Sequence, residues 1–411
     1  MRALAAAAIL LAYACLLVGC SNEAPTPKVV LVAGDAARGH LLMAQLECNR
    51  CHQGAGLTAA PAEKQCIQCH RDILDGKSRG PTPKVDARWH DRVAGLGDAP
   101  SLESVGARFR RGWVVGFLRH PHDLRPLLVP TMPRLPLTET DAEDIATYLV
   151  PEDDPRKERE VDDALLAAAN PAMGRELLIN KGCGSCHWMT GVTALGGTLL
   201  PVGVTVSEPS RAMSLAPDLR FTRDRMSARN LLRWVAGPAE VKADTLMPKI
   251  PLTDAEAKDI AAYILRTPLA PLPKVEAPTV PANLARPVSY DEVKSKVLQR
   301  TCWHCHSDPD LERGDTGPGN TGGFGFKPRG LDLATYEGVF AGTLDDDGQR
   351  RSVFAPMPDG TPRLVAAMLA RHRELAGDET AGIRGMPLGL PALPMEDIQL
   401  VSTWIAQGRP R

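Results

Sequence analysis

Four cysteine–histidine motifs are the residues of this sequence best suited to chemistry. Each has two cysteines separated by two residues and a histidine directly after the second cysteine. This spacing is the attachment signal for a c-type haem. The two thiols add to the porphyrin vinyl groups, and the adjacent histidine becomes the proximal iron ligand. The motifs therefore predict four covalently bound haem c groups, at Cys48-Asn49-Arg50-Cys51-His52, Cys66-Ile67-Gln68-Cys69-His70, Cys183-Gly184-Ser185-Cys186-His187 and Cys302-Trp303-His304-Cys305-His306.

Paired cysteines have other uses, and disulfides, a zinc site or a thioredoxin-like redox pair are the alternatives. Zinc ribbons also use cysteine pairs, but they do not require a histidine after every pair. The four motifs use all but two of the ten cysteines in the chain. The repetition favours haem attachment.

The remaining cysteines, Cys15 and Cys20, lie in an N-terminal leader. Met1-Arg2 is a short positive region, and the apolar run from Ala3 to Val18 is short for a spanning helix. The run ends in Leu17-Val18-Gly19-Cys20, which resembles a bacterial lipobox, in which the cysteine is lipidated and becomes the first mature residue. An ordinary secretory signal is the alternative. Both readings predict export. Ser21, rather than Asp, follows the cysteine, and the resemblance to enterobacterial lipoprotein sorting signals implies a lipid anchor in the outer membrane, facing the periplasm.

The charge balance gives no reason to expect a nucleic-acid partner. The chain has 411 residues and a formal net charge of −1. A protein that binds nucleic acid usually carries a basic face or a strongly basic domain. Proteins of this length commonly have two to three domains.

An internal repeat divides the sequence. Gly39 precedes Cys48 by nine positions, and Gly174 precedes Cys183 by nine. Further along, a Met-Pro segment is followed by a predicted capping box and helix in both copies. Met132 to Tyr148 and Met247 to Tyr263 both span sixteen positions. A gapless repeat of this kind predicts two copies of one fold.

The repeated methionines are candidates for the distal iron ligand. They resemble the methionine of class I cytochromes c, which binds the iron from the loop before the C-terminal helix. On this resemblance Met132 and Met247 are predicted ligands. In the third haem unit Met386 fills the same position before the last helix and is preferred to Met357, which also precedes a proline.

The haem at Cys66 is the odd one. If the helix predicted before Cys48 matches the helix before Cys183, the Cys66 segment is an insertion and Met132 serves the Cys48 haem. A counter-reading assigns Met132 to the Cys66 haem, because His70 and Pro100 are thirty positions apart, as are His187 and Pro217. The leading helix favours the first assignment. His90 is then the predicted distal ligand of the Cys66 haem.

Together these residues make the chain resemble a multihaem c-type cytochrome lipoprotein with class I cytochrome c-like domains. The resemblance implies an all-α fold of three tandem helical domains built around haem, the first with an inserted second haem segment. The predicted segments are a signal peptide (1–20), a tether (21–34), a two-haem domain (35–150), a charged linker (151–168), a second domain (169–267), a Pro-rich linker (268–287) and a third domain (288–411).

The function that this resemblance implies is electron relay between redox partner proteins, a membrane oxidoreductase and an acceptor. Ligation by methionine raises the reduction potential relative to two histidines. Two other classes remain open. One is a haem enzyme, peroxidase-like or reducing a small oxide, with an open iron at the Cys66 haem; the other is a subunit of a respiratory complex or a haem-based sensor.

Overall fold

A computed structural model describes residues 34–78, 83–122, 124–128, 132–151, 155–193, 195, 211–307, 319–378 and 382–411. The predicted lipidation residue Cys20, the leader and nearly all of the tether lie outside the described residues. The described part is helix-rich, and the strands assigned in it, β1 (Thr343–Leu344) and β2 (Arg350–Arg351), form one short antiparallel pair. Residues Gly34–Arg411 form one compact unit, so the division into three domains stays a prediction.

Within this unit the first apolar cluster surrounds the Cys48 motif. Asp35 caps the helix that leads into the motif, and its side chain accepts a hydrogen bond from the Arg38 amide. Thr138 and Asp141 form the predicted capping box at the start of the closing helix. The helices of this region are α2 (Ala36–Gln45), η1 (Cys48–Arg50), α5 (Arg111–Arg119) and α6 (Glu139–Leu149). Their buried side chains, including Met43 and Ile145, pack into one core.

The second cluster repeats this arrangement around the Cys183 motif. Thr253 and Glu256 form the other predicted capping box. Asn170 caps the leading helix, and its own amide donates to Asp259 just as the amide of Asp35 donates to Asp144. The helices are α8 (Pro171–Asn180), η3 (Cys183–Ser185), α9 (Arg211–Leu215), η4 (Leu219–Phe221), α10 (Thr222–Arg225), α11 (Ala228–Ala236), α12 (Pro238–Val241) and α13 (Asp254–Arg266).

The segment around the Cys66 motif forms a small cluster of its own. Ile73, Trp89 and Val93 are its buried core. The helices are η2 (Ala62–Lys64), α3 (Cys66–Leu74) and α4 (Pro83–Val93), and α3 packs against α4. In sequence this cluster lies between the Cys48 motif and Pro100.

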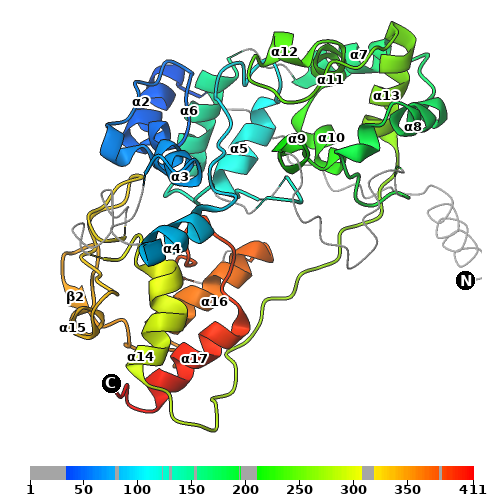
Figure 1. Ribbon diagram of the computed structural model, residues 1–411. Coiled ribbons are helices and arrows are strands. Elements are labelled where there is room, and N and C mark those ends of the chain that lie inside the picture. The colour runs from blue at the N-terminus through cyan, green and yellow to red at the C-terminus, as the bar shows by residue number, and fades with distance from the viewer. Residues whose placement is uncertain are drawn as a thin grey trace, which may run out of the picture. The chain divides into compact units, whose positions relative to one another are not determined.

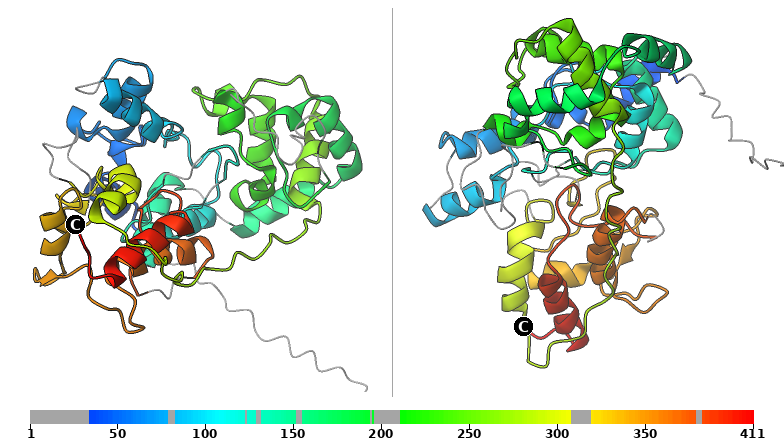
Figure 2. Two further views of the ribbon diagram at one scale, coloured as in Figure 1. Left: turned by 60° about the horizontal axis from the view of Figure 1, so that its bottom comes forward. Right: turned by 90° about the vertical axis from the view of Figure 1, so that its right-hand side faces the viewer.

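The charged stretch predicted as a linker contains a helix, α7 (Pro155–Leu165). Arg110, directly before α5, pairs with Glu158 and with Asp162 of this helix. The linker is therefore held against the first cluster. The Pro-rich stretch after α13 is extended, and Figures 1 and 2 show it running to α14 without helix.

The third cluster contains the Cys302 motif. Ser289 caps the entering helix, and its hydroxyl accepts from the Glu292 amide at 3.3 Å. The helix changes to π geometry before the motif. The elements are α14 (Tyr290–Val293), η5 (Lys294–Cys302), α15 (Tyr336–Ala341), α16 (Arg363–Leu375) and α17 (Met395–Ala406). Trp404 of α17 is fully buried in this core. Within the described part of the chain, no helix is both long and apolar enough to cross a membrane.

Candidate functional site

The histidines of the first and third motifs along the chain are oriented in the same way. His52 Nδ1 lies 2.7 Å from the carbonyl oxygen of Pro100, and His187 Nδ1 lies 2.8 Å from that of Pro217. A carbonyl at this distance accepts the Nδ1 proton and leaves Nε2 as the lone-pair nitrogen. Orientation of this kind by an outer partner is typical of metal-binding histidines.

This geometry bears on the assignment of Met132. The counter-reading paired Pro100 with His70, but the structure pairs Pro100 with His52. His70 Nδ1 lies instead 3.1 Å from the carbonyl oxygen of Leu96, within its own segment. The equivalence of His52 with His187 supports Met132 as the ligand of the Cys48 haem, and that assignment stays a prediction.

His306, in the fourth motif, has a different environment. Its carbonyl oxygen accepts a hydrogen bond from the Leu333 amide at 2.7 Å, and its ring lies against the backbone of Gly319. A Cβ atom on Gly319 would come within 2.5 Å of the ring. The glycine is therefore required for close approach of the loop to this imidazole.

All four motif histidines are suited to bind a metal as neutral imidazoles. Burial lowers the pKa of His52, His70 and His187, and it lowers the pKa of His306 to about 4. A metal needs the deprotonated imidazole nitrogen.

Met247 of the second repeat has a hydrogen-bond donor on its sulfur. Trp234 Nε1 lies 2.9 Å from Met247 Sδ. Trp234 is on α11 and Met247 is in the loop before α13, so the indole fixes the thioether between these elements. A thioether sulfur is a weak hydrogen-bond acceptor, and it keeps electron density for a second partner.

Comparison with known families decides the character of this region. Residues 171–268 match the family model named Cytochrome c. This segment is a cytochrome c domain. Such domains carry covalently bound haem c with its iron and transfer electrons. No curated protein and no solved structure matches the chain.

The donor set of the cytochrome c domain fits haem c. Cys183 and Cys186 are free thiols and half-buried, and His187 offers Nε2. Met247, in the Met-Pro segment of the same repeat, offers a sulfur. The other three motifs bring the same thiols and imidazole together. Burial raises the pKa of Cys48 to about 11 and that of Cys302 to about 12.

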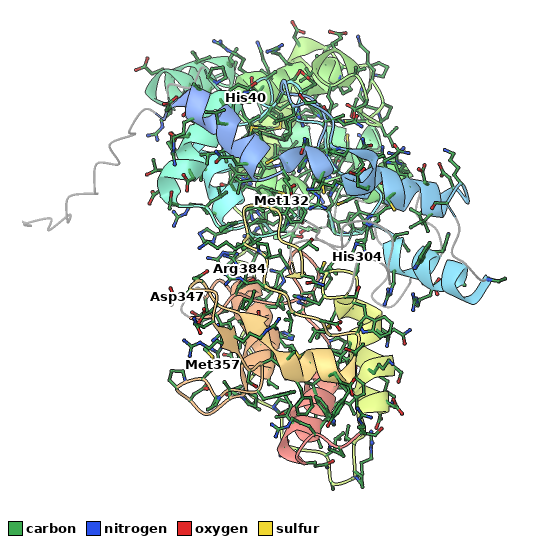
Figure 3. All side chains as sticks on the ribbon, turned by 90° about the vertical axis from the view of Figure 1, so that its left-hand side faces the viewer. His40, Met132, His304, Asp347, Met357 and Arg384 are labelled. Atoms are coloured by element: carbon green, nitrogen blue, oxygen red, sulfur yellow. The ribbon has the colours of Figure 1, made fainter. Side chains whose placement is uncertain are left out.

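The other predicted methionine ligands are half-buried in loops. Met132 packs against the first core, and the Met386 amide donates to the carbonyl of Ala367 on α16 at 2.9 Å. Met357 lines a small pocket with Thr361 and Arg373. Figure 3 shows Met357 well separated from His304, which lies inside the fourth motif. The choice of Met386 over Met357 stays a prediction.

The structure places the predicted ligand His90 on α4, where its side chain is exposed. A different histidine ring lies close to His70. The ring centroids of His70 and His304 are 6.3 Å apart, at an interplanar angle of 51°. His304 lies between the two cysteines of the fourth motif, and it is not among the ligands predicted from the sequence.

Two motifs also meet in space. The thiol of Cys51 is within hydrogen-bonding reach of the thiol of Cys66, and this contact, with burial, raises the pKa of Cys51. The first two attachment sites are therefore neighbours. A pocket of about 470 Å³ is lined by Arg110, Glu158 and Arg223 among others and includes no motif residue.

Sequence reasoning missed three participants in these sites. The pairing of Pro100 with His52 was hidden because a spacing count suggested another partner. The contact of Trp234 with Met247 has no signal in the sequence. The first repeat has Phe117 at the matching position, four residues before a proline, so comparison of the repeats shows no tryptophan in common there. For His304 no sequence signal existed, since its neighbour His70 is far away along the chain.

Proposed function

We propose that this chain is an exported, lipid-anchored tetrahaem cytochrome that relays electrons between a membrane oxidoreductase and an acceptor protein. The observation that carries the proposal is the shared ligand geometry of His52 and His187, one of which lies in the cytochrome c domain. The first motif is built like the third, so we extend the haem assignment from the matched segment to the rest of the chain.

Each group in this proposal has a defined task. The motif cysteines would hold the porphyrin, and His52, His70, His187 and His306 would each bind an iron. Met132, Met247 and Met386 would supply the second protein ligand at three of the sites. The bound haem supplies one-electron chemistry, and the protein supplies ligands, burial and spacing.

Contacts between the attachment sites support a relay. The thiols of Cys51 and Cys66 adjoin, so these residues would hold two porphyrins at neighbouring points of the chain. The cytochrome c domain contacts the first repeat through the Arg110 amide, which donates to the Arg225 carbonyl at 2.8 Å, and through the guanidinium of Arg225, which lies 5.5 Å from the ring centroid of Phe109. Electron tunnelling weakens steeply with distance, and close packing of this kind is what a relay needs.

The count and ligation of haem test the proposal. The mass of the purified, denatured chain should correspond to four covalent haems. Met132→Ala, Met247→Ala and Met386→Ala should each remove one His/Met signal and lower the potential of one haem, because methionine ligation raises it. A chain with one haem, or variants with unchanged spectra, would contradict the proposal. Carbon monoxide binding to one reduced haem of the unmodified protein would instead favour the haem enzyme.

A further inference from the structure

The internal repeat predicts no second iron ligand for the haem proposed at Cys66. The cytochrome c domain and the first repeat each have a Met-Pro segment, and the third unit has Met386. The inserted segment of α3 and α4 has no methionine in its sequence. A ligand for this iron must therefore come from a histidine or from another part of the chain.

The geometry points to His304 as the distal ligand of the Cys66 haem, opposite His70. This inference rests on the proposed haem attachment at Cys66 and Cys69. An imidazole nitrogen binds a first-row metal at about 2.0–2.1 Å, so two imidazoles on opposite faces of one ion put their ring centroids roughly 6 Å apart. The centroids of His70 and His304 are 6.3 Å apart.

The orientation of His70 agrees with this arrangement. Its Nδ1 faces the Leu96 carbonyl at 3.1 Å, so Nε2 is directed to the other side of the ring. His304 is exposed and lies on the part of the third unit that borders α4 (Figure 3). The guanidinium of Arg92 on α4 is near enough to act electrostatically on the thiol of Cys302.

Several contacts hold the third unit in this position. The Phe324 amide donates to the Glu47 carboxylate at 3.1 Å, and the Arg50 guanidinium lies 4.9 Å from the centroid of the Phe324 ring. On the other side, Arg384 Nη1 donates to the Arg134 carbonyl at 2.6 Å. The short distance between His304 and His70 is therefore accompanied by several other contacts between the first and third clusters.

His304 would give the Cys66 haem an unusual connection. The iron would be bound by the first unit through His70 and by the third unit through a residue between the two cysteines that hold the next haem. One side chain would thus join two attachment sites. Two imidazoles also predict that this haem has the lowest potential of the four.

Carbon monoxide binding to the reduced, fully haem-loaded protein tests the inference. The unmodified protein should exclude carbon monoxide at all haems. His304→Ala should bind it at one haem per chain and lose one bis-histidine signal in the electron paramagnetic resonance spectrum of the oxidised protein. His90→Ala should behave like the unmodified protein. Exclusion by His304→Ala, or binding by His90→Ala, would overturn the inference.

Gln68→Ala is the matched control for position. Gln68 is the second residue between the cysteines of its motif, as His304 is in the fourth motif, and it is also exposed. It should leave carbon monoxide excluded. Addition of imidazole to His304→Ala should restore the lost signal, which a general loosening of the fold would not do; no recovery would count against direct ligation.

A second variant covers the case in which His304→Ala impairs attachment at Cys302 and Cys305. His304→Met offers the iron a thioether instead, so carbon monoxide should stay excluded while the lowest potential rises. Four unchanged potentials would overturn the inference. The mass of each variant gives its number of covalent haems and so separates the outcomes. If the unmodified chain carries four haems and substitution of His304 changes neither carbon monoxide binding nor the potentials, the inference alone is wrong. If the unmodified chain carries fewer than four haems, the proposed function is wrong.

Discussion

The methionines of the two Met-Pro segments differ in one neighbour, a side chain with an N–H group. Trp234 donates to the Met247 sulfur at 2.9 Å. In the first repeat the position four residues before the corresponding proline is Phe117, which has no N–H. Two haems with the same predicted ligands should therefore differ in potential, because a donor on the sulfur weakens its electron donation to oxidised iron.

Trp234→Phe tests this difference. Loss of a hydrogen bond worth about 0.5–1.5 kcal/mol should lower one midpoint potential by roughly 20–60 mV. Redox titration followed by optical spectroscopy measures it. The other haems in the same sample are the internal control, and a shift shared by all of them would contradict a local effect.

At this scale the sequence predicts the proximal side best. The thiol spacing and the adjacent histidine are a local pattern in the chain, so they predict the attachment residues directly, and the family match at residues 171–268 agrees with this prediction for the third motif. The outer partner of His52 depends on where Pro100 returns after an inserted segment. Counting positions could not show that Pro100 contacts His52, because the inserted segment supplies a different carbonyl oxygen, that of Leu96, to His70.

Close helix crossings position both repeats. A Cβ atom on Gly39 of α2 would lie 2.1 Å from the Asp144 carbonyl oxygen, and one on Gly174 of α8 would lie 2.0 Å from that of Asp259. Real Cβ atoms do not approach this closely. The glycine found nine residues before each motif is therefore needed for contact of the leading helix with the closing helix.

Gly39→Ala should destabilise the first repeat by about 1–3 kcal/mol or more, because the helices must separate to admit the methyl group. Gly116→Ala is the matched control, since an added Cβ there has nothing within 4 Å. In an exposed helix interior this change should stabilise by about 0.5–1 kcal/mol. Denaturant unfolding of the haem-loaded variants measures both, and equal effects would refute the packing argument.

Element prediction succeeded where a local signal exists. The two capping boxes predicted after the Met-Pro segments are confirmed, at Thr138 and Thr253. The stretch predicted as a charged linker contains the helix α7, whose Glu158 and Asp162 pair with Arg110. These partners lie 48 and 52 positions from Arg110 in sequence, so no local pattern could indicate the pairing.

Across the whole molecule, Glu47 joins the first and third clusters. Its carboxylate pairs with Lys64 at 3.0 Å and Arg50 at 3.1 Å and accepts from the Phe324 amide, 277 positions away. No periodicity or composition could predict a contact of this kind. The contact depends on how two segments that are far apart in the sequence pack together.

The contact at Glu47 should weaken in acid. Burial alone would raise the pKa of Glu47, but hydrogen bonds from Lys64 and the Phe324 amide and the charge of Arg50 outweigh it and lower the pKa below its ordinary value of 4.5. A carboxyl with a lowered pKa stabilises the fold above its ordinary value and loses that contribution as the pH falls. The protection factors of residues 319–330 in hydrogen exchange, which compare the measured rates with those of an unfolded chain at the same pH, should therefore fall below about pH 4.5.

Glu47→Gln should quicken exchange of the same residues already at neutral pH and remove most of this pH dependence. Glu63→Gln, a change of a neighbouring acidic residue exposed on η2, should leave both unchanged. If Glu47→Gln keeps the exchange pattern of the unmodified chain, the ion pairs at this position do not hold the third unit.

The contact of Cys51 with Cys66 has a consequence for how the protein is made. These sulfurs belong to different motifs, yet the folded chain brings them together. On the proposed function these sulfurs would carry two haems, and a disulfide between them in an oxidising compartment would block both attachments. The proposal therefore requires that haem be attached while the segment from Cys48 to Cys69 is still open and its thiols are kept reduced.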